Sequence, residues 1–132
     1  MATRHHARMA VVSLLYAFDL GNKSIADVSD EILEDKKIRN KQKEFAMVLF
    51  RGVMDHLEQI DTAIINNLKE WDFNRLGSIE RATLRLGAYE IMFSNLDAAV
   101  VINEAIEVSK AFGTEQSPKF INGVLDAISK DS

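Results

Sequence analysis

Hydrophobic residues recur along this chain with the spacing of amphipathic helices. The first stripe follows the i, i+3, i+4, i+7 rule and consists of Val11, Leu14, Leu15 and Phe18. The stripe predicts a helix over about residues 3–20. Thr3 is a suitable N-cap for this helix, and Gly21 is a suitable stop after it.

Similar stripes predict the remaining helices, and no segment has the alternation of a strand. The expected ranges are about 25–33, 40–67 with a break near 59–61, 78–93, 98–112, and a last helix from Pro118. The helix over 78–93 is apolar almost all round, which is typical of a central helix surrounded by others. Suitable caps are Ser78, Asp97, Ser117 and, for a left-handed C-terminal turn, Gly113.

The pattern therefore predicts an all-α fold of six or seven helices. The connection over 68–78 is a natural seam, which divides the helices into two small bundles that share one core. We expect a single domain over 1–132, with an N-terminal subdomain of about 1–70 and a C-terminal subdomain of about 71–132.

Composition supports this interpretation and excludes several classes. The 132 residues include one proline, six glycines and no cysteine, so disulfides, thiolate nucleophiles and sulfur-ligated metals are excluded. No apolar run approaches the roughly 18 residues of a membrane span. The first residues lack a secretory signal, so we expect a cytoplasmic protein with no membrane partner.

Charge is divided into blocks along the chain, although the net charge is only −4. Residues 1–18 contain two arginines and no acid, residues 19–35 contain one cation and six acids, and residues 36–51 contain six cations and one acid. The blocks over 19–51 are typical of solvated helix faces. The first block indicates a basic site more strongly, because no acid offsets it.

No set of side chains has the spacing of a catalytic or metal site. His5 and His6 are adjacent, so on a helix they point about 100° apart and form a poor metal pair. His56 is interpreted as a surface or cap residue. Glu104 and Glu107 lack the histidine of a carboxylate metal motif and are interpreted as solvated charges. We therefore expect no enzyme activity, no cofactor and no metal.

Basic and aromatic residues gather at helix ends instead. They are Arg4, His5, His6 and Arg8 at the first helix, Lys110 and Phe112 before the last loop, and Lys119 and Phe120 after it. Single-stranded RNA is bound by such cations together with aromatic faces that stack on unpaired bases. Spacing alone leaves open a second interpretation, in which Phe112 and Phe120 are core residues flanking a loop.

The order of residues in several segments resembles a known family. VINEAIE at 101–107, KAFG at 110–113 and SPKFINGVLD at 117–126 resemble the C-terminal signature of the NusB family of transcription antitermination factors. RHHAR at 4–8 and IERATLRLGAYE at 79–90 resemble the arginine-rich first helix and the central helix of that family. Gly52 also matches, and the resemblance spans almost the whole chain.

The resemblance implies a non-catalytic adaptor with two three-helix subdomains. Family members pair with NusE, a small-subunit ribosomal protein, bind the boxA element of nascent RNA and help RNA polymerase read through terminators. Carried over to this chain, the RNA-binding residues are Arg4, His5, His6, Arg8, Lys110, Phe112, Gln116, Lys119 and Phe120. The NusE-facing residues are Tyr16 and Glu80. A shared surface requires the two arginines to lie on the same side of the molecule as Lys119 and Phe120.

The chain departs from the family where His5 and His6 replace arginines. An unperturbed histidine, with a pKa of about 6.5, is mostly neutral at pH 7. We therefore expect the chain alone to bind RNA more weakly than an arginine-rich relative does. Its affinity for RNA should rise as the pH falls toward 6. Arg8→Ala is expected to weaken RNA binding without unfolding the protein.

Three motif residues, Asn103, Asn122 and Gly123, are expected to be structural, with Gly123 permitting close packing of helices. Two other functions remain open: a helical protein-interaction module that does not bind RNA, and an isolated NusB-like domain related to RNA methyltransferases. The absence of a glycine-rich cofactor loop opposes the second. Whether the chain is a monomer or a homodimer also remains open.

Overall fold

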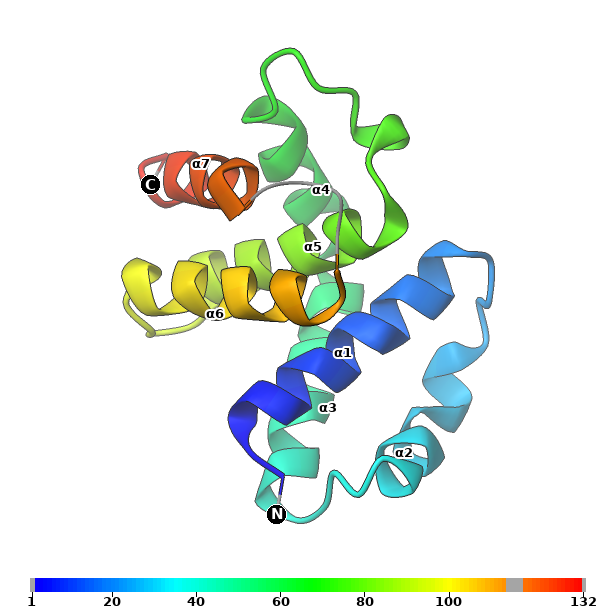
Figure 1. The fold of residues 1–132 in the computed structure, drawn as a ribbon. Coiled ribbons are helices and arrows are strands. Elements are labelled where there is room, and N and C mark those ends of the chain that lie inside the picture. Colours follow the sequence, from blue (N-terminus) through cyan, green and yellow to red (C-terminus); the bar gives the residue numbers. More distant parts are fainter. Residues whose placement is uncertain (1, 114–117, 132) are drawn as a thin grey trace.

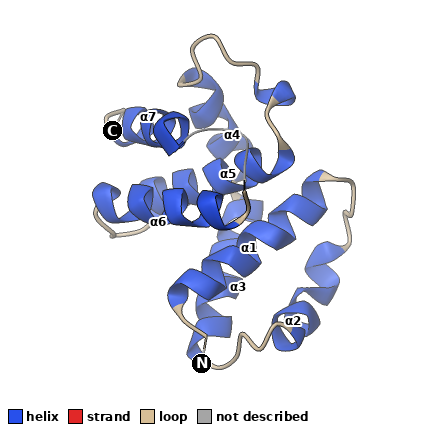
Figure 2. Cartoon of the chain, viewed as in Figure 1, coloured by secondary structure: helices blue, strands red, loops and turns tan. Residues whose placement is uncertain are grey.

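The computed structural model describes residues 2–113 and 118–131, and within them the regular structure is entirely helical (Figures 1 and 2). Seven α-helices and one short 3-10 helix occur in these ranges. They are α1 (Arg4–Asp19), α2 (Ile25–Asp35), α3 (Lys41–Asp55), α4 (Leu57–Asn66), η1 (Phe73–Arg75), α5 (Ser78–Phe93), α6 (Ala98–Ala111) and α7 (Pro118–Ser129). The prediction of an all-α fold with six or seven helices is confirmed.

The fifth helix is the centre of the molecule. It packs against α1, α3, α4, α6 and α7, and every residue from Ala82 to Ala88 is buried (Figure 1). Its nearly continuous apolar surface thus has a partner on each side, as the sequence predicts.

Local signals fix most helix ends. Thr3 and His6 form a capping box, in which the Thr3 hydroxyl accepts from the His6 N–H and His6 Nδ1 accepts from the Thr3 N–H. Asp97 accepts from the Ala99 N–H, and Gly113 adopts a left-handed φ of 64° after α6. Gly77 is the N-cap of α5 in place of the expected Ser78. The expected cap Ser117 lies outside the described residues.

The long helix expected over 40–67 is divided at His56, not near 59–61. The His56 ring donates through Nδ1 to the Gly52 carbonyl oxygen at 2.9 Å, and the same residue flanks both α3 and α4. The apolar stripe continues across this break, since both Val53 and Ile60 are fully buried. Hydrophobic periodicity therefore could not locate it.

Ion pairs between partly buried side chains also join the helices. Asp19 at the end of α1 accepts from Arg81 Nε and from Arg85 Nη1, each at 3.1 Å, and Arg85 Nε donates to Asp61 of α4 at 2.8 Å. Burial would raise the pKa of Asp19, but hydrogen bonding and charge from Arg81, helped by Ser78 and Arg85, outweigh it and hold the pKa below its ordinary value. The two halves of the chain are thus linked by charge as well as by apolar packing, and a division near residue 70 stays a prediction.

Candidate nucleic-acid interface

The first turns of α1 point three of the expected RNA-binding side chains in three directions, because successive helical residues lie about 100° apart. The Arg4 guanidinium lies over the ring of Phe45 on α3, at 4.6 Å from the ring centroid. His5 Nδ1 lies 3.7 Å from Glu104 Oε2 on α6. His6 faces a groove on the remaining side.

Arg8 turns inward, and the structure corrects the expectation that it can be replaced without consequence for the fold. Only 4% of Arg8 is exposed. Its Nε and Nη2 donate to both carboxylate oxygens of Glu90 on α5 at 3.0 to 3.2 Å. The signal was present in the sequence: Arg8 precedes Val11, Val12 and Leu15 by three, four and seven positions, so it lies on the buried stripe of α1.

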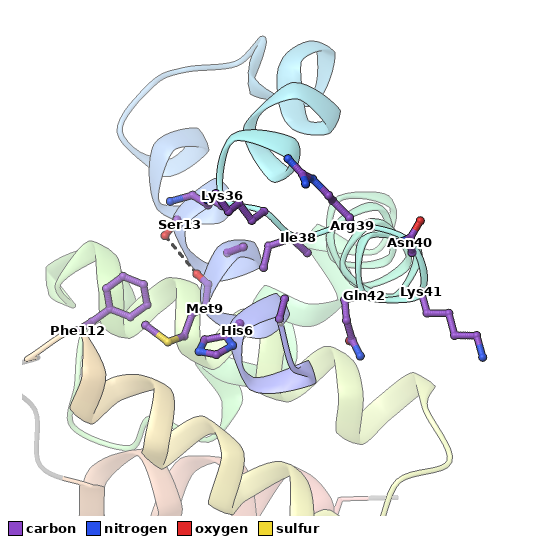
Figure 3. A pocket seen from close by; sticks show the side chains of 13 residues that line it. His6, Met9, Ser13, Lys36, Ile38, Arg39, Asn40, Lys41, Gln42 and Phe112 are labelled. Carbon is purple, nitrogen blue, oxygen red and sulfur yellow. Dashed lines mark hydrogen bonds between the residues drawn. The ribbon is translucent and has the colours of Figure 1, made fainter.

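The groove beside His6 has a volume of about 1070 Å³. Figure 3 shows Phe112, Met9 and His6 along one side and the segment over 36–42 along the other. Phe112 comes from the C-cap of α6 and His6 from α1. The structure therefore brings together two expected RNA-binding residues that are 106 positions apart.

The expected residues around the last loop lie elsewhere. Lys110 is exposed beside Glu107, with 3.8 Å between Nζ and Oε1, and Lys119 is exposed. Half-buried Phe120 packs edge-on against Trp71, with 5.1 Å between ring centroids. In Figure 1, α6 lies between α7 and the first turns of α1. Lys119 and Phe120 do not line the groove of His6 and Phe112, and Gln116 lies outside the described residues.

The two expected partner-facing residues differ in accessibility. Tyr16 is exposed near the end of α1. Glu80 is only 6% exposed, and its carboxylate lies so close over Gly77 that a Cβ there would fall 2.0 Å from Oε2. The Glu80 side chain therefore covers the backbone of Gly77 at the start of α5. Of the two residues, Tyr16 is the one that a partner can reach directly.

Three motif residues expected to be structural are exposed. Asn103 lies on the outer face of α6, and Asn122 and Gly123 lie on the outer face of α7. A Cβ added at Gly123 would have no heavy atom within 4 Å, so close helix packing does not explain this glycine. The buried stripe of α7, beginning with Ile121 and Val124, already leaves Asn122 and Gly123 on the opposite side.

The described residues contain neither a candidate metal cluster nor a candidate membrane span. No group of three or more histidines, aspartates and glutamates among them is placed to hold a metal ion. No helix in the same ranges has the length and hydrophobicity needed to cross a lipid bilayer. The sequence pattern missed the basic segment over 36–42, which it assigned to a solvated face and which forms one side of the groove.

Known proteins match the chain over nearly its full length. Residues 5–130 match the model of the NusB family. The chain is 74% identical over 131 residues to the transcription antitermination protein NusB of Sulfurimonas denitrificans, with 99% of each chain covered. It is 58% identical to the NusB protein of Wolinella succinogenes, with 99% of this chain and 97% of that one covered.

Solved structures give the same result. A crystal structure of the antitermination factors NusB and NusE in complex with dsRNA has a TM-score of 0.87 at 34% identity, covering 98% of this chain and 97% of that one. A structure of T. maritima NusB has a TM-score of 0.85 at 36% identity, covering 98% and 92%. Both the order of residues and the arrangement of helices are therefore similar to those of this family.

Proposed function

Because this chain belongs to the NusB family of transcription antitermination factors, we propose that it is a non-catalytic adaptor for boxA-type single-stranded RNA and a NusE-type ribosomal protein. It would act in the cytoplasm, as part of a complex with RNA polymerase. The observation that carries the RNA part is the groove in which His6 and Phe112 meet.

The groove has the two properties that unpaired nucleotides need. Phe112 and Met9 supply an aromatic and an apolar surface for a base, and His6 with the neighbouring lysines supplies donors for phosphates. Exposed Arg4 lies on the same N-terminal turn as His6. A relative of this fold has been crystallised with NusE and dsRNA, so duplex RNA is the necessary comparison for a single strand.

The negative net charge of the chain is compatible with RNA binding if a protein partner supplies part of the affinity. Two of the expected cations already face carboxylates in the free chain: Arg8 pairs with Glu90, and Lys110 lies beside Glu107. Weak binding of RNA by the chain alone follows, because fewer cations remain to neutralise phosphates. Tyr16 is the accessible residue around which we place the ribosomal protein.

The test is a titration of labelled boxA-like, scrambled and duplex RNA, with and without the purified ribosomal protein, at two salt concentrations. We expect the boxA-like single strand to bind more tightly than the others, and most tightly with the partner present. His6→Ala and Phe112→Ala should weaken binding at least tenfold, whereas Lys130→Ala, just after the end of α7, should not.

Other outcomes would overturn the proposal. Equal binding of all three RNAs with a steep salt dependence would indicate electrostatic attraction alone. Binding of the partner without binding of any RNA would favour the protein-interaction module. Sedimentation of the free chain, measured alongside the titration, distinguishes a monomer from a homodimer.

A further inference from the structure

The side of the groove opposite Phe112 is formed by the connection between α2 and α3. We propose that Lys36 and Lys37 of this connection, together with Lys41 and Gln42 of the first turn of α3, are a further RNA contact. The RNA held at His6 and Phe112 would then continue across the groove onto this segment. The inference rests on the proposed function and adds residues that the family resemblance does not assign.

The charge of the segment is available to a ligand. The eight residues from Lys36 to Lys43 include five cations and no acid. Arg39 and Lys43 are held by Glu34, at 3.0 Å from Arg39 Nε and 2.7 Å from Lys43 Nζ. Lys36, Lys37 and Lys41 are exposed, and within the described ranges none of them forms an ion pair.

The backbone holds these lysines in place. Lys37 and Asn40 have φ values of 62° and 58°, in the left-handed region that residues other than glycine seldom adopt. Such conformations persist where the surroundings enforce them, and they concentrate at functional sites. Here Ile38, between the two, is 3% exposed, and its N–H donates to the Leu33 carbonyl at 2.9 Å. The buried isoleucine thus anchors a turn whose neighbouring side chains remain outside.

An unused acceptor adds specificity to this charge. Gln42 lines the groove from the first turn of α3, and its Oε1 is buried without a hydrogen-bond partner among the described residues. A buried acceptor without a partner is unfavourable, and a turn of the side chain that brings the amide oxygen into the groove would let an amino group of a base pair with it. Ile38 and Met9 provide the apolar floor between Gln42 and Phe112 (Figure 3).

The test removes the three free lysines and compares the result with a matched control. The groove variant is Lys36→Gln, Lys37→Asn, Lys41→Gln. The control variant is Lys23→Gln, Lys69→Asn, Lys130→Gln, which removes the same charge elsewhere. Both variants change one left-handed lysine, Lys37 or Lys69, to asparagine, which tolerates that conformation.

The affinity of each protein, with its ribosomal partner, is measured for boxA-like RNA with and without flanking nucleotides over a series of salt concentrations. We expect the groove variant to lose at least tenfold in affinity for the longer RNA. Its slope of log affinity against log salt should shrink by about 2, since each phosphate contact on a single strand contributes about 0.7. The control should stay within about twofold of the wild type. Gln42→Ala should weaken binding without changing the slope, because the amide carries no charge.

The outcomes separate this inference from the proposed function. If the wild type binds no RNA with its partner, both fail. If the wild type binds RNA and the groove variant keeps its affinity and slope, the groove contact is wrong and the proposed function stands. If the groove variant loses the ribosomal partner in the absence of RNA, the segment is a protein-binding surface instead. An unchanged denaturation midpoint shows that the groove variant is folded.

Discussion

Arg8 and Glu90 form a buried ion pair that joins the first helix to the central one across 82 positions of the chain. Two guanidinium nitrogens of Arg8 donate to both carboxylate oxygens, and the two side chains are 5% and 2% exposed. The basic start of this protein therefore does two things. Arg8 holds the fold together, while Arg4 and His6 remain accessible to a ligand.

Replacing Arg8 should destabilise the protein. Arg8→Ala leaves the Glu90 carboxylate buried without its partner, which costs about 3–5 kcal/mol for such pairs. We expect a clearly lower midpoint in urea denaturation followed by circular dichroism. Arg4→Ala, which removes an exposed cation, should change the free energy of unfolding by less than about 1 kcal/mol. Equal midpoints for the two variants would show that the pair contributes nothing.

Gly52 and Gly123 should respond oppositely to alanine. A Cβ at Gly52 would fall 2.2 Å from Cζ of Tyr89, whose ring packs beside Phe93. Moving this ring should destabilise the protein by about 1–3 kcal/mol. Gly123→Ala meets no atom within 4 Å and should stabilise α7 by about 0.5–1 kcal/mol. Thermal unfolding of the two variants measures both effects, and a shift of the same sign in each would contradict the prediction.

Asp19 should contribute to acid sensitivity. Its pKa is lowered in the folded protein from an ordinary value of 3.8, so the unfolded chain binds the proton more tightly. The stabilisation is complete well above pH 3.8 and is lost as the pH falls through the lower value of the folded state. Asp19→Asn should therefore unfold more easily than the wild type at pH 7, with the difference shrinking toward pH 3. Denaturation midpoints from pH 7 to pH 3 measure it, and a constant difference would be inconsistent with this role.

Trp71 should report what happens at the start of α7. It is the one tryptophan of the chain, is 52% exposed and lies edge-on to Phe120. If RNA reaches Lys119 and Phe120, base stacking nearby should change the intensity of tryptophan emission. The measurement is a fluorescence titration of the complex with boxA-like RNA, with scrambled RNA as the control. Unchanged emission at saturating RNA would remove this end of α7 from the binding surface.

Several candidate residues could be found from the chain alone because their signal is local. Helix caps such as Thr3 and Asp97, and the left-handed turn at Gly113, depend on neighbours within a few positions. His6 and Phe112 were chosen for their chemistry, and they do meet. Glu80 was carried over from the family resemblance, but its carboxylate folds back over Gly77, which only the geometry at the start of α5 reveals.

Hydrophobic spacing and residue order were enough to establish the helical class, the central position of α5 and the family. Each of these follows from periodicity or from residue order along the chain. The pairing of Arg8 with Glu90, the break at His56 and the groove between Phe112 and residues 36–42 needed coordinates. In the ion pair and the groove, residues far apart along the chain come into contact, and the direction in which helices pack decides such contacts. A stripe of apolar residues shows that a face is buried, but it does not say against what.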